Sequence, residues 1–76
     1  MNKDRRATIA GIVSRLGDIK GEVEDVCSEE QDYYDNMTEN FKSGEKGERA
    51  QDAISTLEQA ISSIESAMDD LNVASE

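Results

Sequence analysis

The sequence predicts an all-α fold, a two-helix antiparallel coiled-coil hairpin that forms one domain over residues 1–76. Three observations predict it. Apolar residues recur at alternating steps of three and four in both halves of the chain, which is the a/d heptad pattern of a coiled coil. A segment rich in Asn and Gly separates the halves. Facing positions of the two patterns also share one register.

The first helix is expected over about residues 4–39. Its apolar series is Ile9, Ile12, Leu16, Ile19, Val23, Val26, Tyr33 and Met37. Glu30 occupies the one slot of this series that is not apolar. Glu30 either reaches solvent or pairs with Lys or Arg across the bundle, or it fixes the register, as single polar core residues can.

The turn is expected over about residues 40–46, within a segment that holds Asn36, Asn40, Ser43, Gly44 and Gly47. Asn and Gly can adopt the left-handed conformation that ends many helices. Ser43 can cap the next helix. Glu45 then falls in the first turn, where a carboxylate suits the positive end of the helix dipole.

The second helix is expected over about residues 47–73. Its seam comprises Ala50, Ile54, Leu57, Ile61, Ile64, Met68 and Leu71. In an antiparallel pair, the numbers of facing core residues have a constant sum. Leu16 with Leu71, and Val26 with Ile61, both sum to 87, and the midpoint falls inside the expected turn.

Charge supports the same pairing of helices. A basic group at the chain start lies beside an acidic group at the chain end, so that each compensates the other. The basic group is Arg5, Arg6 and Arg15, and the acidic group is Glu65, Asp69 and Asp70. Exposed pairs of this kind contribute only about 0–1 kcal/mol each, so they bias orientation more than stability.

A second apolar row predicts a homodimer. This row flanks the seam and comprises Val13, Cys27 and Tyr34 on the first helix and Ala53, Ala60 and Ala67 on the second. Burying it between two copies would give a four-helix bundle. Gly17 and Gly21 indicate either close helix packing or a kink that frees residues 1–16 as a mobile arm.

Composition excludes several classes of function. The chain has a net charge of -10, no His and a single Cys27, so the usual general base and metal ligand are missing. We expect no enzyme activity, cofactor or metal. Apolar runs are too short for a membrane span, which needs about 20 residues, and direct nucleic-acid binding needs a positive face. The expected location is cytoplasmic.

The acidic charge is concentrated in residues 21–40, which hold eight acidic and no basic side chains. Such a surface favours a partner protein with a basic surface. The candidate partner-binding residues combine this acidic run with aromatic side chains near the turn. They are Glu22, Asp25, Glu29, Asp32, Tyr34, Asp35 and Phe41.

The stretch SEEQDYYDNMTENFKSGEKGERAQDAISTLEQAISSIESA resembles a family of small, acidic, uncharacterised helical proteins encoded by bacteriophages and prophages. The matching parts are Glu29 to Met37 and Ala53 to Glu65, and Thr38 stands where relatives carry proline. The resemblance implies a location in the host bacterial cytoplasm. The leading hypothesis is an interaction module that binds and inhibits a host or defence protein. The alternatives are an acidic nucleic-acid mimic that blocks a DNA- or RNA-binding protein, and a structural oligomerisation or virion accessory element.

Overall fold

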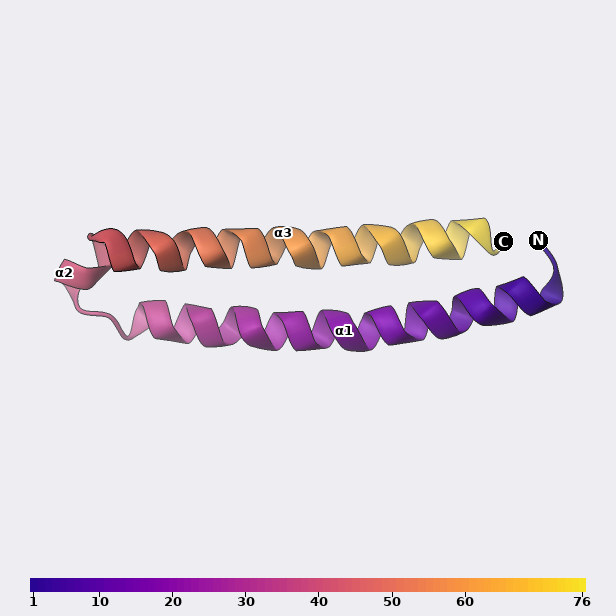
Figure 1. Ribbon diagram of the computed structural model, residues 1–76, viewed down its shortest axis with the longest axis horizontal. Helices are drawn as coiled ribbons and strands as arrows, with labels where there is room; N and C mark the ends of the chain where they lie inside the picture. Colours follow the sequence, from indigo (N-terminus) through magenta and orange to yellow (C-terminus); the bar gives the residue numbers. More distant parts are fainter.

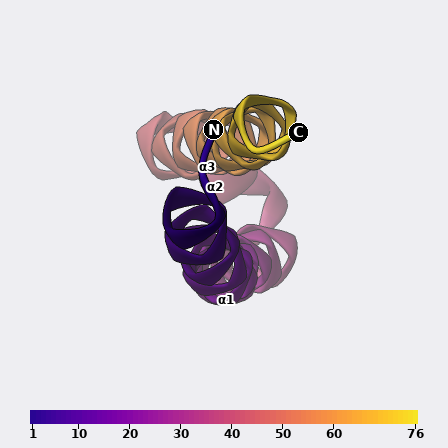
Figure 2. The same ribbon diagram turned by 90° about the vertical axis from the view of Figure 1, so that its right-hand side faces the viewer.

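The computed structural model describes residues 1–76 and contains three α-helices, α1 (Lys3–Asp35), α2 (Glu39–Lys42) and α3 (Glu45–Ala74). The chain is 88% helical and has no strand, which confirms the all-α prediction. Helices α1 and α3 run antiparallel along each other, with α2 at one end and both termini at the other (Figure 1). Figure 2, a view along the rod, shows that neither long helix is enclosed by others.

Asn2 caps the N-terminus of α1, where its side-chain oxygen accepts a hydrogen bond of 2.8 Å from the backbone N–H of Arg5. This capping satisfies one of the free N–H groups of the first turn. The helix is continuous through its three glycines, so no break frees residues 1–16. An added Cβ at Gly21 would meet nothing within 4 Å, so the expected close packing at Gly21 is wrong.

The turn differs from its prediction in two ways. Helix α1 ends at Asp35 rather than near residue 39, and the four-residue α2 follows. No residue has a positive φ, because two short connections around α2 reverse the chain without a left-handed residue. Ser43 does not cap α3; its hydroxyl donates to the backbone oxygen of Glu39, and Gly44 is the residue before α3. Glu45 lies in the first turn of α3, as expected.

Gly47 lies where α2 packs against the first turn of α3. It is buried, and a Cβ added there would overlap the backbone of Lys42, lying 2.6 Å from its Cα. The close approach of α2 to the first turn of α3 therefore requires a residue without a side chain. Next to it, Ala50 and Ile54 are the only buried hydrophobic residues of the chain.

The seam follows the predicted series on α3 but not on α1. On α3, every residue of the series is buried or half-buried. On α1, the predicted core residues Ile19, Val26 and Tyr33 are 45%, 51% and 52% exposed. The residues one position further along, Lys20, Cys27 and Tyr34, are half-buried instead. The expectation that Ile19, Val26 and Tyr33 face α3 is wrong.

The physical reason is the width of the apolar arc on α1. Apolar residues occupy three neighbouring rows of this helix, and one partner helix can cover only two rows. The row that faces α3 carries Lys20 and Tyr34, whose polar ends bond to α3. The row of Ile19, Val26 and Tyr33 makes no such bond to α3, and it is the row left exposed.

Candidate interaction surface

Two polar contacts join α1 to α3 on one side of the rod. The ammonium of Lys20 lies 2.9 Å from a carboxylate oxygen of Glu65, and the side-chain amide of Gln51 donates a 2.9 Å hydrogen bond to the hydroxyl of Tyr34. Both pairs of residue numbers have the same sum, 85, so they report a single register along the rod. Gly17 and Met68, which lie level with each other across the seam, also sum to 85.

The Lys20–Glu65 ion pair is the only ion pair between α1 and α3. The hydrogen bond to Glu65, and then the charge of that carboxylate, raise the pKa of Lys20 above its ordinary value of 10.5. The ion pairs expected between the arginines near the N-terminus and the acids near the C-terminus are not formed. Lys20 pairs with Glu65 because Lys20 lies in the row of α1 that faces α3.

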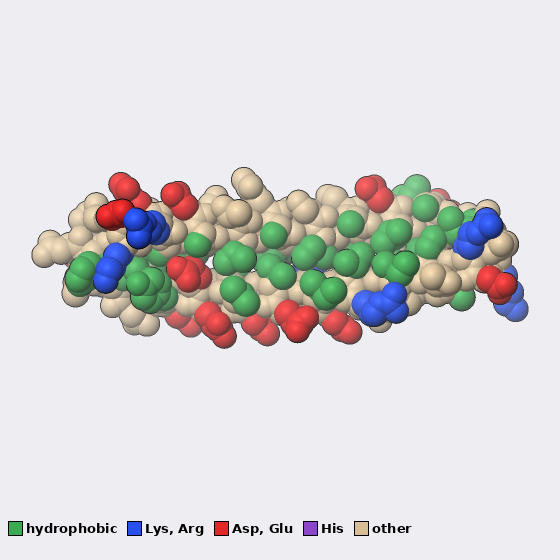
Figure 3. Space-filling view, in the orientation of Figure 1, with side chains coloured by type: hydrophobic (Ala, Val, Ile, Leu, Met, Phe, Trp, Pro, Cys, Tyr) green, Lys and Arg blue, Asp and Glu red, His purple; other side chains and the backbone are tan.

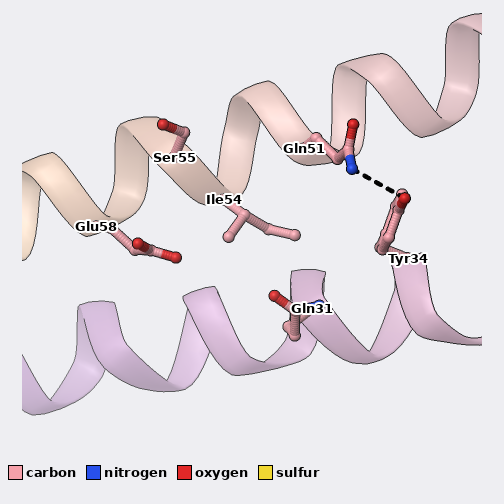
Figure 4. Close-up of a pocket in the computed structure, with 6 residues that line it drawn as sticks. All are labelled: Gln31, Tyr34, Gln51, Ile54, Ser55 and Glu58. Atoms are coloured by element: carbon pink, nitrogen blue, oxygen red, sulfur yellow. Dashed lines mark hydrogen bonds between the residues drawn. The ribbon is translucent and has the colours of Figure 1, made fainter.

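An open groove lies on this polar side, seen in Figure 4 with the direction of α3 reversed relative to Figure 1. Its lining residues are Gln31, Tyr34, Gln51, Ile54, Ser55 and Glu58. A second groove next to it includes Cys27 and Ile61. The grooves offer hydrogen-bonding groups, and no group of three or more Cys, Asp or Glu residues is arranged to hold a metal ion.

The opposite side carries an exposed apolar face. Ile19, Val26 and Tyr33 are spaced by seven residues and lie in one line along α1, about 10 Å apart. On α3, Gln51 and Glu65 mark the polar side, and helical geometry places the alanine row on the other flank. We call the combined surface the apolar face; its residues are Ile19, Val26, Tyr33, Ala53, Ala60 and Ala67. Figure 3 shows hydrophobic side chains in a nearly continuous band along the line between the long helices.

An acidic row borders the apolar face along α1. Glu22, Asp25, Glu29 and Asp32 are all exposed, and their spacing of three and four places them in one line. None of them forms an ion pair. Figure 3 shows acidic side chains along the lower edge of the molecule, next to the hydrophobic band. The structure therefore brings together an apolar line and a parallel line of free carboxylates.

The other candidate partner-binding residues lie elsewhere. The carboxylate of Asp35 accepts a hydrogen bond of 3.0 Å from Gln31, a residue that lines the groove on the polar side. Tyr34 is half-buried in the same groove. Phe41 is 52% exposed at the tip, where the ammonium of Lys46 lies 5.1 Å from its ring centre. Four of the seven candidates thus form one surface, and three do not.

The residues expected at a dimer interface are also divided. Val13, Cys27 and Tyr34 are half-buried, and the last two line grooves against α3. The alanines lie on the apolar face, where Ala67 is exposed and Ala53 and Ala60 are half-buried. Beside the alanines lie Ile19, Val26 and Tyr33, which the heptad periodicity predicts to be in the seam. Periodicity identifies an apolar row, but it does not determine which neighbouring helix covers that row.

No family model, curated protein or solved structure matches the chain. The resemblance to phage-encoded proteins therefore stays a prediction. None of the three helices combines the length and the apolar character needed to span a membrane.

Proposed function

We propose that this chain is a non-enzymatic protein-interaction module, an antiparallel coiled-coil hairpin that assembles into a four-helix bundle and binds a basic partner protein. The observation that carries the proposal is the exposed apolar line of Ile19, Val26 and Tyr33 beside a line of unpaired carboxylates. Apolar side chains at heptad spacing serve a helical interface. Carboxylates at its border select a positively charged surface.

The small core supports this proposal. Only two hydrophobic residues are buried, and a chain of this size draws about 3–5 kcal/mol or less from a single core. Association that covers further apolar surface would stabilise the fold as well as provide its function. The acidic row stays at the border of that contact and steers a basic partner toward it.

The proposed partner is a host bacterial protein, following the resemblance to phage-encoded proteins. Covering the basic surface of such a protein would block whatever that surface binds, which makes the chain an inhibitor. The acidic row is the part of the surface that this role requires, and the apolar face is the part that assembly requires.

The test is capture from a bacterial lysate with two matched variants. In one variant, Glu22→Gln, Asp25→Asn, Glu29→Gln and Asp32→Asn neutralise the acidic row. In the control, Asp52→Asn, Glu58→Gln, Asp69→Asn and Asp70→Asn remove the same charge from α3. We expect the wild type and the control to retain one basic protein that the row variant loses. Equal retention by all three proteins would refute the role of the acidic row.

A nucleic-acid mimic is the second candidate, favoured by the spacing of the acidic row. Four exposed carboxylates occupy one line between Glu22 and Asp32, a rise of about 15 Å. Phosphates along one DNA strand repeat at about 3.4 Å, so the charge spacing is similar in scale. Release of the captured protein by DNA, with binding that weakens steeply in salt, would assign mimicry. A stable oligomer that captures no protein would assign a structural role.

A further inference from the structure

We propose that a second copy of the chain covers the apolar face, with the two copies antiparallel and α1 packed against α1 of the partner copy. This inference rests on the self-assembly proposed above and adds the face, the orientation and the register. It assigns the interface to Ile19, Val26 and Tyr33 rather than to the edge that contains Cys27.

The exposed area of the chain matches what a dimer needs. Its accessible surface is 5486 Å², whereas a compact monomer of 8.4 kDa exposes about 4600 Å². The excess of about 900 Å² is close to the ~800 Å² that each partner contributes to a standard interface. The radius of gyration, 17.3 Å, exceeds the ~11 Å of a compact chain of this length for the same reason. The exposed excess is therefore large enough to supply one interface of standard size.

The apolar line of α1 is complementary to itself when it is reversed. If facing residues have numbers that sum to 45, Ile19 faces Val26 of the partner copy and the half-buried Ile12 faces Tyr33 of the partner copy. Each apolar residue thus meets another. The same sum sets Met1 level with Gly44 of the partner copy, so the two rods, each 58 Å long, overlap from end to end.

Charge distribution decides between the antiparallel dimer and its parallel alternative. Residues 1–20 and 67–76, which form the end with the termini, carry five basic and five acidic side chains and are neutral. Residues 21–66, the end with the turn, carry three basic and thirteen acidic side chains, a net charge of -10. The whole net charge therefore lies in one half of the rod.

A parallel dimer would place the two -10 halves side by side. Neighbouring helices in a bundle are about 8–10 Å apart, which is close to the Debye length of about 8 Å at physiological salt, so salt would screen this repulsion only in part. The antiparallel dimer places each acidic half beside a neutral one. It also sets Arg15 level with Glu29 and Glu30 of the partner copy, by the same sum of about 45.

Sedimentation equilibrium of the intact chain tests the face. We expect a mass of twice 8.4 kDa for the wild type. Val26→Lys should weaken the dimer by about tenfold or more, because it places an unpaired charge in an apolar contact. The matched control is Val73→Lys, at a residue that is 65% exposed and lies outside the apolar face; it should leave the dimer unchanged. A monomeric wild type, or equal effects of the two variants, would overturn the assignment.

Disulfide trapping tests the orientation in the folded chain, with Cys27→Ser as background. Residues 15, 22 and 29 form the row that borders the apolar line. Facing numbers in this row sum to 44, one less than in the apolar line, so residue 22 meets its own counterpart. Glu22→Cys should therefore form a homodimeric disulfide. Arg15→Cys and Glu29→Cys should cross-link only when mixed, and Ser14→Cys on the outer surface should not cross-link.

The outcomes separate this inference from the proposed function. Homodimeric disulfides from both Arg15→Cys and Glu29→Cys would show parallel α1 helices and overturn the orientation while leaving self-assembly intact. A dimer in which none of these cysteines reacts would overturn the face. Capture of a basic protein through the acidic row is measured in a separate experiment. The dimer assignment and the proposed function can therefore be refuted independently.

Discussion

At the scale of single residues, Gly47 is the position where the structure leaves the least room for a side chain. Its neighbour across the turn is the backbone of Lys42, which cannot move aside as a side chain can. We predict that Gly47→Ala lowers the free energy of unfolding by about 1–3 kcal/mol, the usual cost of overpacking. Gly21→Ala is the matched control; it meets open space and should raise stability by up to about 1 kcal/mol through helix propensity. Urea unfolding measures both, and a stabilising Gly47→Ala would mean that α2 does not approach α3.

Lys20 gives a prediction about alkaline pH. Its pKa is raised in the folded chain by Glu65, so the folded state holds this proton more tightly than the unfolded state does. The ion pair therefore stabilises fully below pH 10.5 and is lost as the pH rises through the higher pKa of the folded state. Melting temperatures of the wild type and Lys20→Gln should converge only above that range. A difference that already disappears below about pH 9, well under the ordinary pKa of Lys, would point to another group.

At the scale of elements, the α1 seam contains one acidic residue. Glu30 is half-buried and has no ion pair or hydrogen bond. Glu30→Leu should raise the free energy of unfolding by about 1–2 kcal/mol, because it replaces a carboxylate by apolar surface in the seam. The control is Asp52→Leu at an exposed position of α3, with an expected change near zero. Sedimentation should show an unchanged oligomeric state; a new state would identify Glu30 as the residue that fixes register.

At the scale of the whole molecule, the uneven charge predicts a response to salt. The acidic row contains three like-charge neighbours at helical spacing, each costing about 0.2–0.5 kcal/mol. Screening by about 1 M NaCl, where the Debye length is about 3 Å, should raise the melting temperature by about 2–12 °C, because each kcal/mol corresponds to about 4–8 °C for a domain of this size. The variant with a neutralised acidic row should melt higher at low salt and respond much less. An equal response in both proteins would place the repulsion elsewhere.

The sequence by itself determined the helical class, the seam of α3 and the acidic row, because these follow from side-chain type and from the helical period alone. The sequence identifies Gly47 as a turn residue. It does not explain why glycine is required there, because only the folded chain brings the backbone of Lys42 against this position. The same holds for the residues that end α1 and begin α3, where α2 replaces the expected loop.

Only the tertiary structure decided which rows of α1 face α3. Three neighbouring rows of this helix are apolar, and periodicity ranks them almost equally. The choice depends on the polar ends of Lys20 and Tyr34, which find partners in Glu65 and Gln51 across the seam. Because α3 covers only two rows of α1, these contacts leave the third row, Ile19, Val26 and Tyr33, exposed. Rows that are equivalent along one helix become different only when a second helix meets them.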